Sequence, residues 1–217
     1  MEEKRKETAE LYFQYKRLVI ACEELSVDFN AFVQPVMELS RAFDHLMRIE
    51  AVDKRLEIDY PNHDGLDDPA AYAYGQEKAA HSHMLRAFFD AADWFSIEIR
   101  ERIITSMQVY PYEFVKAAFP EYYSEVRTDV EAINREIAGL REKKDVGNMP
   151  LKEAERYVDL ITRLNNHLAD VNNRIPAIEE AGDRIKKDNS LARVKKYGMA
   201  AIIAIISGVI GWLIKGW

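Results

Sequence analysis

The chain has 217 residues, 48% of them apolar and 31% charged, which is enough for one or two packed domains and unlike a disordered or low-complexity protein. The formal net charge of −7 is uneven, because residues 183–217 carry seven Lys or Arg against two acidic residues (+5), which leaves −12 on residues 1–182. Electrostatic binding to nucleic acid needs clustered positive charge, so we expect no nucleic acid partner for the acidic part.

The first predicted element is a long helix over residues 11–46. Pro35 lies inside it and removes one backbone donor, so we expect a kink or a break there. Apolar residues recur at alternating spacings of four and three, the heptad pattern of a helix packed along a seam. They are Leu11, Tyr15, Leu18, Cys22, Leu25, Phe29, Phe32, Val36, Leu39, Phe43 and Leu46. Residues 56–69, LEIDYPNHDGLDDP, then predict a solvated loop, because their acidic residues do not follow the order of a calcium-binding loop.

A second long helix is predicted over residues 69–109. Asp68 can cap its start, and Pro69 suits the first helical position. Its apolar residues point to several sides, as Phe88 and Phe89 illustrate, and a helix of this kind belongs in the middle of a bundle.

Polar residues within that central helix need partners, because an unpaired buried charge is costly. Arg86 and Asp90 are four residues apart and can pair along the helix. With a histidine of the first helix they make up a candidate polar site, whose members are His45, His81, Arg86, Asp90 and Asp93. We expect a structural salt-bridge network, and the alternative is an enzyme built around these residues. We find no catalytic, cofactor-binding or metal-binding motif, so we assign no residue to those roles and expect no cofactor.

A helical hairpin is predicted over residues 111–187. After a short helix at 113–119, Pro120 can open a helix with an apolar stripe from Val126 to Leu140, and KKDVGNMP turns the chain. A second apolar stripe runs from Tyr157 to Ile178. Two such stripes joined by a short turn predict an antiparallel coiled coil. We expect a kink or hinge around Pro176, Gly182 and residues 188–190.

Residues 188–217 are predicted to form a basic collar and a transmembrane helix. Arg193, Lys195 and Lys196 precede 18 residues without a formal charge, Tyr197 to Ile214, which would span about 27 Å as a helix. Lys and aromatic residues border both ends, as at a membrane interface. Small residues recur at four-residue spacing and could promote helix association in lipid; they are Ala200, Ala204, Ser207, Gly208 and Gly211. The alternative is a buried C-terminal helix of a soluble bundle.

These elements predict an all-α protein: an elongated helical bundle with an antiparallel coiled-coil hairpin and a C-terminal transmembrane helix. We expect three parts, a helical bundle at 1–110, the hairpin at 111–187 and the collar with the anchor at 188–217. The excess of Lys and Arg before the apolar run places the bulk of the chain in the cytoplasm, which fits the single cysteine and the absence of an N-terminal secretory signal.

The function expected from this architecture is that of a tail-anchored, single-pass membrane protein that acts through an unidentified protein partner and through self-association as a homo-oligomer. A membrane-disrupting effector of the toxin or defence type is one form of that function. The alternatives are a helical-bundle enzyme, which we favour less, and a soluble coiled-coil adaptor or scaffold.

Overall fold

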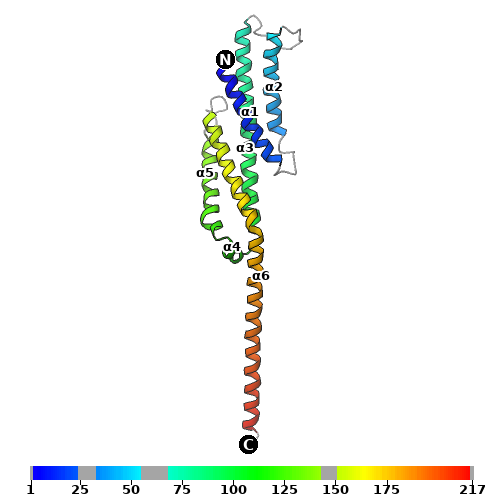
Figure 1. The fold of residues 1–217 in the computed structure, drawn as a ribbon, viewed down its shortest axis with the longest axis vertical. Helices are drawn as coiled ribbons and strands as arrows, with labels where there is room; N and C mark the ends of the chain where they lie inside the picture. The colour runs from blue at the N-terminus through cyan, green and yellow to red at the C-terminus, as the bar shows by residue number, and fades with distance from the viewer. Residues whose placement is uncertain (1, 24–32, 55–67, 143–150, 216–217) are drawn as a thin grey trace. The chain divides into compact units, whose positions relative to one another are not determined.

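The computed structural model describes residues 2–23, 33–54, 68–142 and 151–215, and all secondary structure within these ranges is helical (Figure 1). The side chains of residues 2, 3, 22, 23, 201 and 204–215 lie outside the description. The described helices are α1 Glu2–Glu23, α2 Val33–Asp53, α3 Pro69–Gln108, α4 Tyr112–Ala118, the π-helix Tyr122–Val126, α5 Arg127–Glu142 and α6 Leu151–Lys215. The predicted all-α class and the helical bundle are therefore confirmed.

The chain divides into two compact units that interleave along the sequence. The first comprises Met1–Ile104 with Thr128–Ala169, and the second Thr105–Arg127 with Asp170–Trp217. The three consecutive domains expected from the sequence remain a prediction.

α3 is the central helix of the first unit, as its sequence predicts. Phe88 and Phe89 point in different directions and are both buried, and Ala87, Ala91 and Ala92 are buried beside them. The helix begins where expected, because Asp68 Oδ1 accepts hydrogen bonds from the backbone N–H groups of Ala70 and Ala71, each at 3.1 Å.

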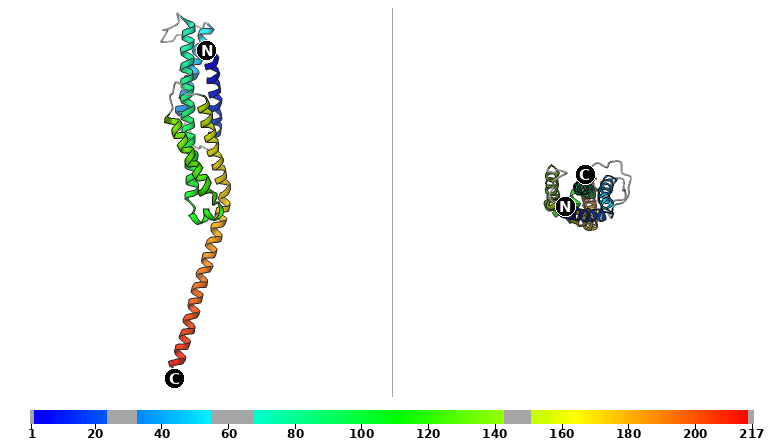
Figure 2. Two further views of the ribbon diagram at one scale, coloured as in Figure 1. Left: turned by 90° about the vertical axis from the view of Figure 1, so that its left-hand side faces the viewer. Right: turned by 90° about the horizontal axis from the view of Figure 1, so that it is seen from above.

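α5 and the first part of α6 form the predicted antiparallel hairpin (Figures 1 and 2). Most residues of both predicted stripes are buried, with Ile133 and Ile137 on one arm and Tyr157 and Leu164 on the other among the innermost side chains, while Leu140 and Ile175 are half-buried. An ion pair also joins the two arms, since Arg156 of α6 donates two hydrogen bonds of 2.6 and 2.9 Å to the Glu136 carboxylate of α5. The predicted turn at residues 143–150 lies outside the described residues.

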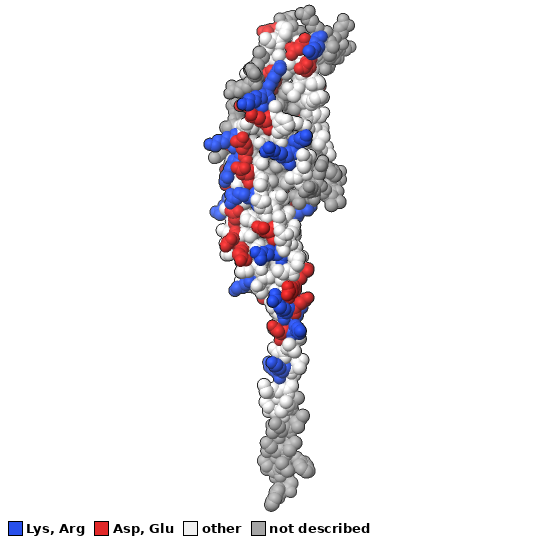
Figure 3. Space-filling view, in the orientation of Figure 1, with Lys and Arg blue, Asp and Glu red and all other residues white. Residues whose placement is uncertain are grey.

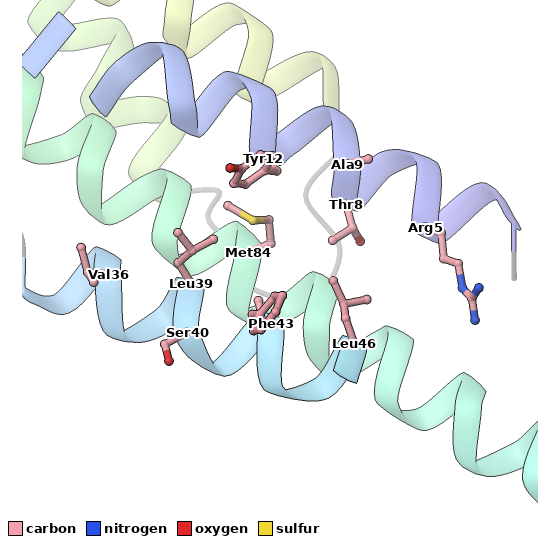
Figure 4. Close-up of a pocket in the computed structure, with 11 residues that line it drawn as sticks. Arg5, Thr8, Ala9, Tyr12, Val36, Leu39, Ser40, Phe43, Leu46 and Met84 are labelled. Atoms are coloured by element: carbon pink, nitrogen blue, oxygen red, sulfur yellow. The ribbon is translucent and has the colours of Figure 1, made fainter. Parts of the chain in front are cut away.

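The stripe predicted over residues 11–46 is divided between two helices, but not at Pro35. The helix α1 ends at Glu23, and α2 begins at Val33 and runs in the opposite direction (Figure 4). The apolar positions 25, 29 and 32 lie between these helices, outside the described residues. Pro35 does not break α2, since it falls in the first turn, where its missing N–H has no acceptor within the helix.

The second unit packs α4 and the π-helix against residues of α6. Phe114, Val115 and Phe119 are buried there, and the guanidinium of Arg174 lies 5.4 Å from the centre of the Phe119 ring. The absence of a side chain at Gly182 allows the Phe114 ring to pack against α6, because a Cβ at that position would lie 2.5 Å from Phe114 Cδ2.

α6 continues through the predicted hinge without interruption. Pro176 is exposed, so the carbonyl oxygen left without a donor one turn earlier can bind water instead. Within the described residues, no helix combines the length and the apolar character that crossing a membrane requires.

Candidate functional site

An apolar groove opens between α1 and α2 in the first unit. Its volume is about 730 Å³, within the range of ligand-binding pockets, and Met84 of α3 forms its floor (Figure 4). The remaining lining residues are Arg5, Thr8, Ala9 and Tyr12 of α1 and Val36, Leu39, Ser40, Ala42, Phe43 and Leu46 of α2. We call this feature the α1–α2 groove.

The α2 wall of the groove is one row of apolar side chains. Val36, Leu39, Phe43 and Leu46 follow one another at spacings of three, four and three residues and point into the gap toward α1 (Figure 4). Val36 is 53% and Phe43 60% exposed, so much of their apolar surface is left in contact with water. The row belongs to the stripe that the sequence predicted to be a packed seam, but only Leu39 and Leu46 are half-buried in it, while Val36 and Phe43 stay exposed.

Another face of α2 carries a buried carboxylate, Glu38, that sequence reasoning did not single out. It is bound by Arg41 of its own helix and by two residues of α3: His83 Nδ1 donates to Glu38 Oε2 at 2.6 Å, and Arg86 Nη1 lies 3.8 Å from the same oxygen. Burial alone would raise the pKa of Glu38, but the hydrogen bonds and positive charges of His83 and Arg41 outweigh it and lower that pKa.

Two members of the predicted polar site lie at this carboxylate, His45 and Arg86. The His45 ring stacks on His83, with ring centres 5.2 Å apart, and its Nδ1 donates to Gln76 Oε1 at 2.6 Å. The sequence signal for Glu38 was its place on the same side of α2 as the buried residues Ala42 and Ile49.

The other predicted site residues lie elsewhere. His81 faces α1, with its Nδ1 3.1 Å from Thr8 Oγ1, and Asp90 has an interaction partner of its own. Asp93 belongs to the contact with the hairpin, where it accepts hydrogen bonds from Arg141 Nε at 2.7 Å and from the Tyr157 hydroxyl. The five residues therefore form no single site.

The chemistry of these clusters is that of ion pairs that hold helices together. Glu38 joins α2 to α3, and Asp93 joins α3 to both arms of the hairpin. Among the described residues, no group of three or more His, Cys, Asp or Glu side chains is placed to hold a metal ion.

The C-terminal part of α6 has a different character. Ala181 and Gly182 are its last buried residues, and every residue from Lys186 to Ala200 is exposed. The collar residues Arg193, Lys195 and Lys196 are among them, and Figure 3 shows cations near the end of the described surface of α6. Ala200 is exposed as well, whereas the side chains of Ala204, Ser207, Gly208 and Gly211 lie outside the described residues.

The sequence matches no protein-family model, and comparison with curated proteins and with solved structures finds no similar protein.

Proposed function

We propose that this protein is held at a membrane by the C-terminal part of α6 and acts through contacts with other protein chains. The observation that carries the proposal is the exposure of large apolar side chains where α6 has left its packed part. Val194, Met199, Ile202 and Ile203 are 68, 64, 58 and 61% exposed. Leaving such side chains in water costs about 25 cal/mol for each Å² of apolar surface, and a bilayer would remove that cost.

The placement of charge around the helix favours a segment that crosses the bilayer over one that lies on its surface. With about 3.6 residues per turn, Lys187, Arg193, Lys195 and Lys196 point in four directions about 60–120° apart. An amphipathic helix in the plane of the interface would gather its cations on one face. A collar of cations all around the axis instead fits a helix that passes through the headgroup layer.

Fractionation of cells that express the full chain, or a version that ends at Lys187, tests the anchor. We expect the full chain in the membrane fraction after a high-pH carbonate wash and the shortened chain in the soluble fraction. A full chain that is released by the wash would contradict the proposal.

Self-association is the second part of the proposed function, and its support is the spacing of small residues in the apolar segment. Ala204 and Gly208 lie one turn apart, and Ile at both positions would keep helix axes apart while preserving hydrophobicity. We expect Ala204→Ile with Gly208→Ile to reach the membrane but to have a smaller mass in detergent, measured by light scattering. An unchanged mass would exclude this ridge as the contact.

The outcome of assembly is tested by the membrane potential of expressing cells. A loss of potential that the double variant abolishes indicates an effector that permeabilises the membrane. Assembly without such a loss indicates a tether or scaffold that concentrates the acidic helical part on a surface.

A further inference from the structure

The C-terminal half of α1 carries cations and apolar side chains together on one outward face. Four residues lie there at positions i, i+3, i+4 and i+7, a spacing that places them on the same side of a helix. They are Phe13, Lys16, Arg17 and Ile20. All four are exposed, and Phe13 and Ile20 keep 60 and 53% of their surface in water. We call these four residues the α1 patch.

The two cations of the α1 patch have no carboxylate beside them. Along a helix, a charged side chain meets the residues three and four positions away. None of these neighbours is acidic; they are Tyr12, Phe13, Gln14, Val19, Ile20 and Ala21. Within the part of the chain that the structure describes, neither cation forms an ion pair with another element. Glu10, one turn before Phe13, has its own partner, because Lys6 Nζ lies 3.9 Å from its Oε1.

We infer that the α1 patch binds the anionic surface of a lipid bilayer, with this face of α1 lying on the headgroup layer. Lys and Arg side chains hold their charged ends among lipid headgroups, while neighbouring apolar side chains enter the boundary with the acyl chains. Phe13 and Ile20 flank the two cations, so both kinds of side chain meet the surface at one level. Tyr12 packs edge-on against Phe13, with ring centres 5.7 Å apart, and adds an aromatic side chain of the kind that membrane interfaces favour.

The charge of the surrounding chain does not prevent this contact. Residues 1–182 have a net charge of −12, but charges more than about 8 Å apart are largely screened at physiological ionic strength. A surface that touches the α1 patch is therefore governed by Lys16 and Arg17. A nucleic acid would offer phosphates to these cations but no acyl layer for Phe13 and Ile20, so the pairing of cations with apolar side chains favours a bilayer.

The α1 patch lies entirely within the first unit and includes no residue of α6. The inference therefore goes beyond the proposed function, and it stands or falls separately from the C-terminal anchor.

The test measures binding of the full chain, held in nanodiscs of neutral phosphatidylcholine, to separate vesicles of phosphatidylserine and phosphatidylcholine in equal parts. We expect Lys16→Gln with Arg17→Gln to weaken this binding about 30-fold, because each cation near an anionic surface contributes about 1 kcal/mol and about 1.4 kcal/mol is a factor of ten. Lys78→Gln with Lys152→Gln, at exposed positions of other helices, removes the same charge and should leave the binding unchanged. Circular dichroism verifies that each variant keeps its helical structure.

Two results would overturn the inference. Unchanged binding by the Lys16 and Arg17 variant would show that the α1 patch does not touch the vesicle, and equal losses in both double variants would show that only the total charge matters. Uptake into the nanodisc reports on the anchor alone. A chain that does not enter the disc contradicts the anchor, and the same variants are then compared free in solution.

A polarity-sensitive fluorophore tests whether the partner is a bilayer, in a Cys22→Ser background. Attached to Phe13→Cys, its emission should shift to the blue when anionic vesicles are added, because this position enters the apolar boundary. Attached to Asp159→Cys, an exposed position on the hairpin, it should not shift. Polyuridylate supplies phosphates without an acyl layer and should cause no shift at Phe13→Cys. No shift with vesicles, or an equal shift with polyuridylate, would overturn the assignment of a bilayer.

Discussion

Replacing Gly182 by Ala tests how closely α4 packs on α6. The new Cβ would lie 2.5 Å from Phe114 Cδ2, and the ring would have to move by about 0.9 Å to restore an ordinary contact of 3.4 Å. Forcing extra atoms into a packed site costs about 1–3 kcal/mol, whereas Ala in place of Gly in a helix gains about 1 kcal/mol. The expected net effect is a loss of about 1 kcal/mol in the local stability of the second unit.

Gly75 provides the matched control, because it lies within α3 and a Cβ there would meet nothing within 4 Å. Gly75→Ala should therefore stabilise α3 by up to about 1 kcal/mol, and the difference between the variants isolates the steric cost at Gly182. The assay is amide hydrogen exchange, which reads local opening in each unit separately. We expect faster exchange in α4 and around residue 182 for Gly182→Ala, and slower exchange in the first turns of α3 for Gly75→Ala. If both variants slow exchange equally, the close approach of Phe114 is refuted.

Two further predictions concern the first unit. Burial lowers the pKa of His81, so the unfolded chain binds a proton more readily than the folded one. The free energy of unfolding should therefore fall as the pH decreases from about 6.5. His81→Gln should weaken this dependence, measured by urea titrations at pH 7 and pH 5. Tyr157→Phe should cost about 1.5–3 kcal/mol in urea unfolding, because the buried hydroxyl donates to the Asp93 carboxylate, while Tyr74→Phe, at a 53% exposed position, should change stability by less than about 0.5 kcal/mol. Equal effects of the two Tyr changes would contradict a special role for the Asp93 contact.

Local patterns were enough to predict the helices that are covered on all sides or paired along a seam. Asp68 caps α3 as its residue type and its position before Pro69 indicate, and the stripes of the hairpin are buried as their spacing indicates. The cap and the backbone groups that it binds lie within a few residues of each other, and the two arms of the hairpin carry matching stripes that are close in the chain.

Periodicity does not say whether a face is covered, and this explains the error at α2. Val36 and Phe43 have the spacing of a packed seam, yet they line an open groove. The Glu38 cluster was missed for a related reason, because its partners His83 and Arg86 come from a helix more than 40 residues away along the chain. The grouping of His81 and Asp93 into one site failed because residues on one long helix can meet different neighbours around its circumference.

The uninterrupted course of α6 from Gly182 to its exposed end fixes the rotational phase of that end. In an α-helix each inserted residue turns everything beyond it by about 100° and shifts it by about 1.5 Å. The directions in which Val194, Met199 and Ile202 point are therefore set by the orientation of Gly182, which contacts Phe114 of α4. A flexible linker would erase this relation, so the collar and the apolar segment are presented to their surroundings with an orientation encoded by the number of residues between them and α4.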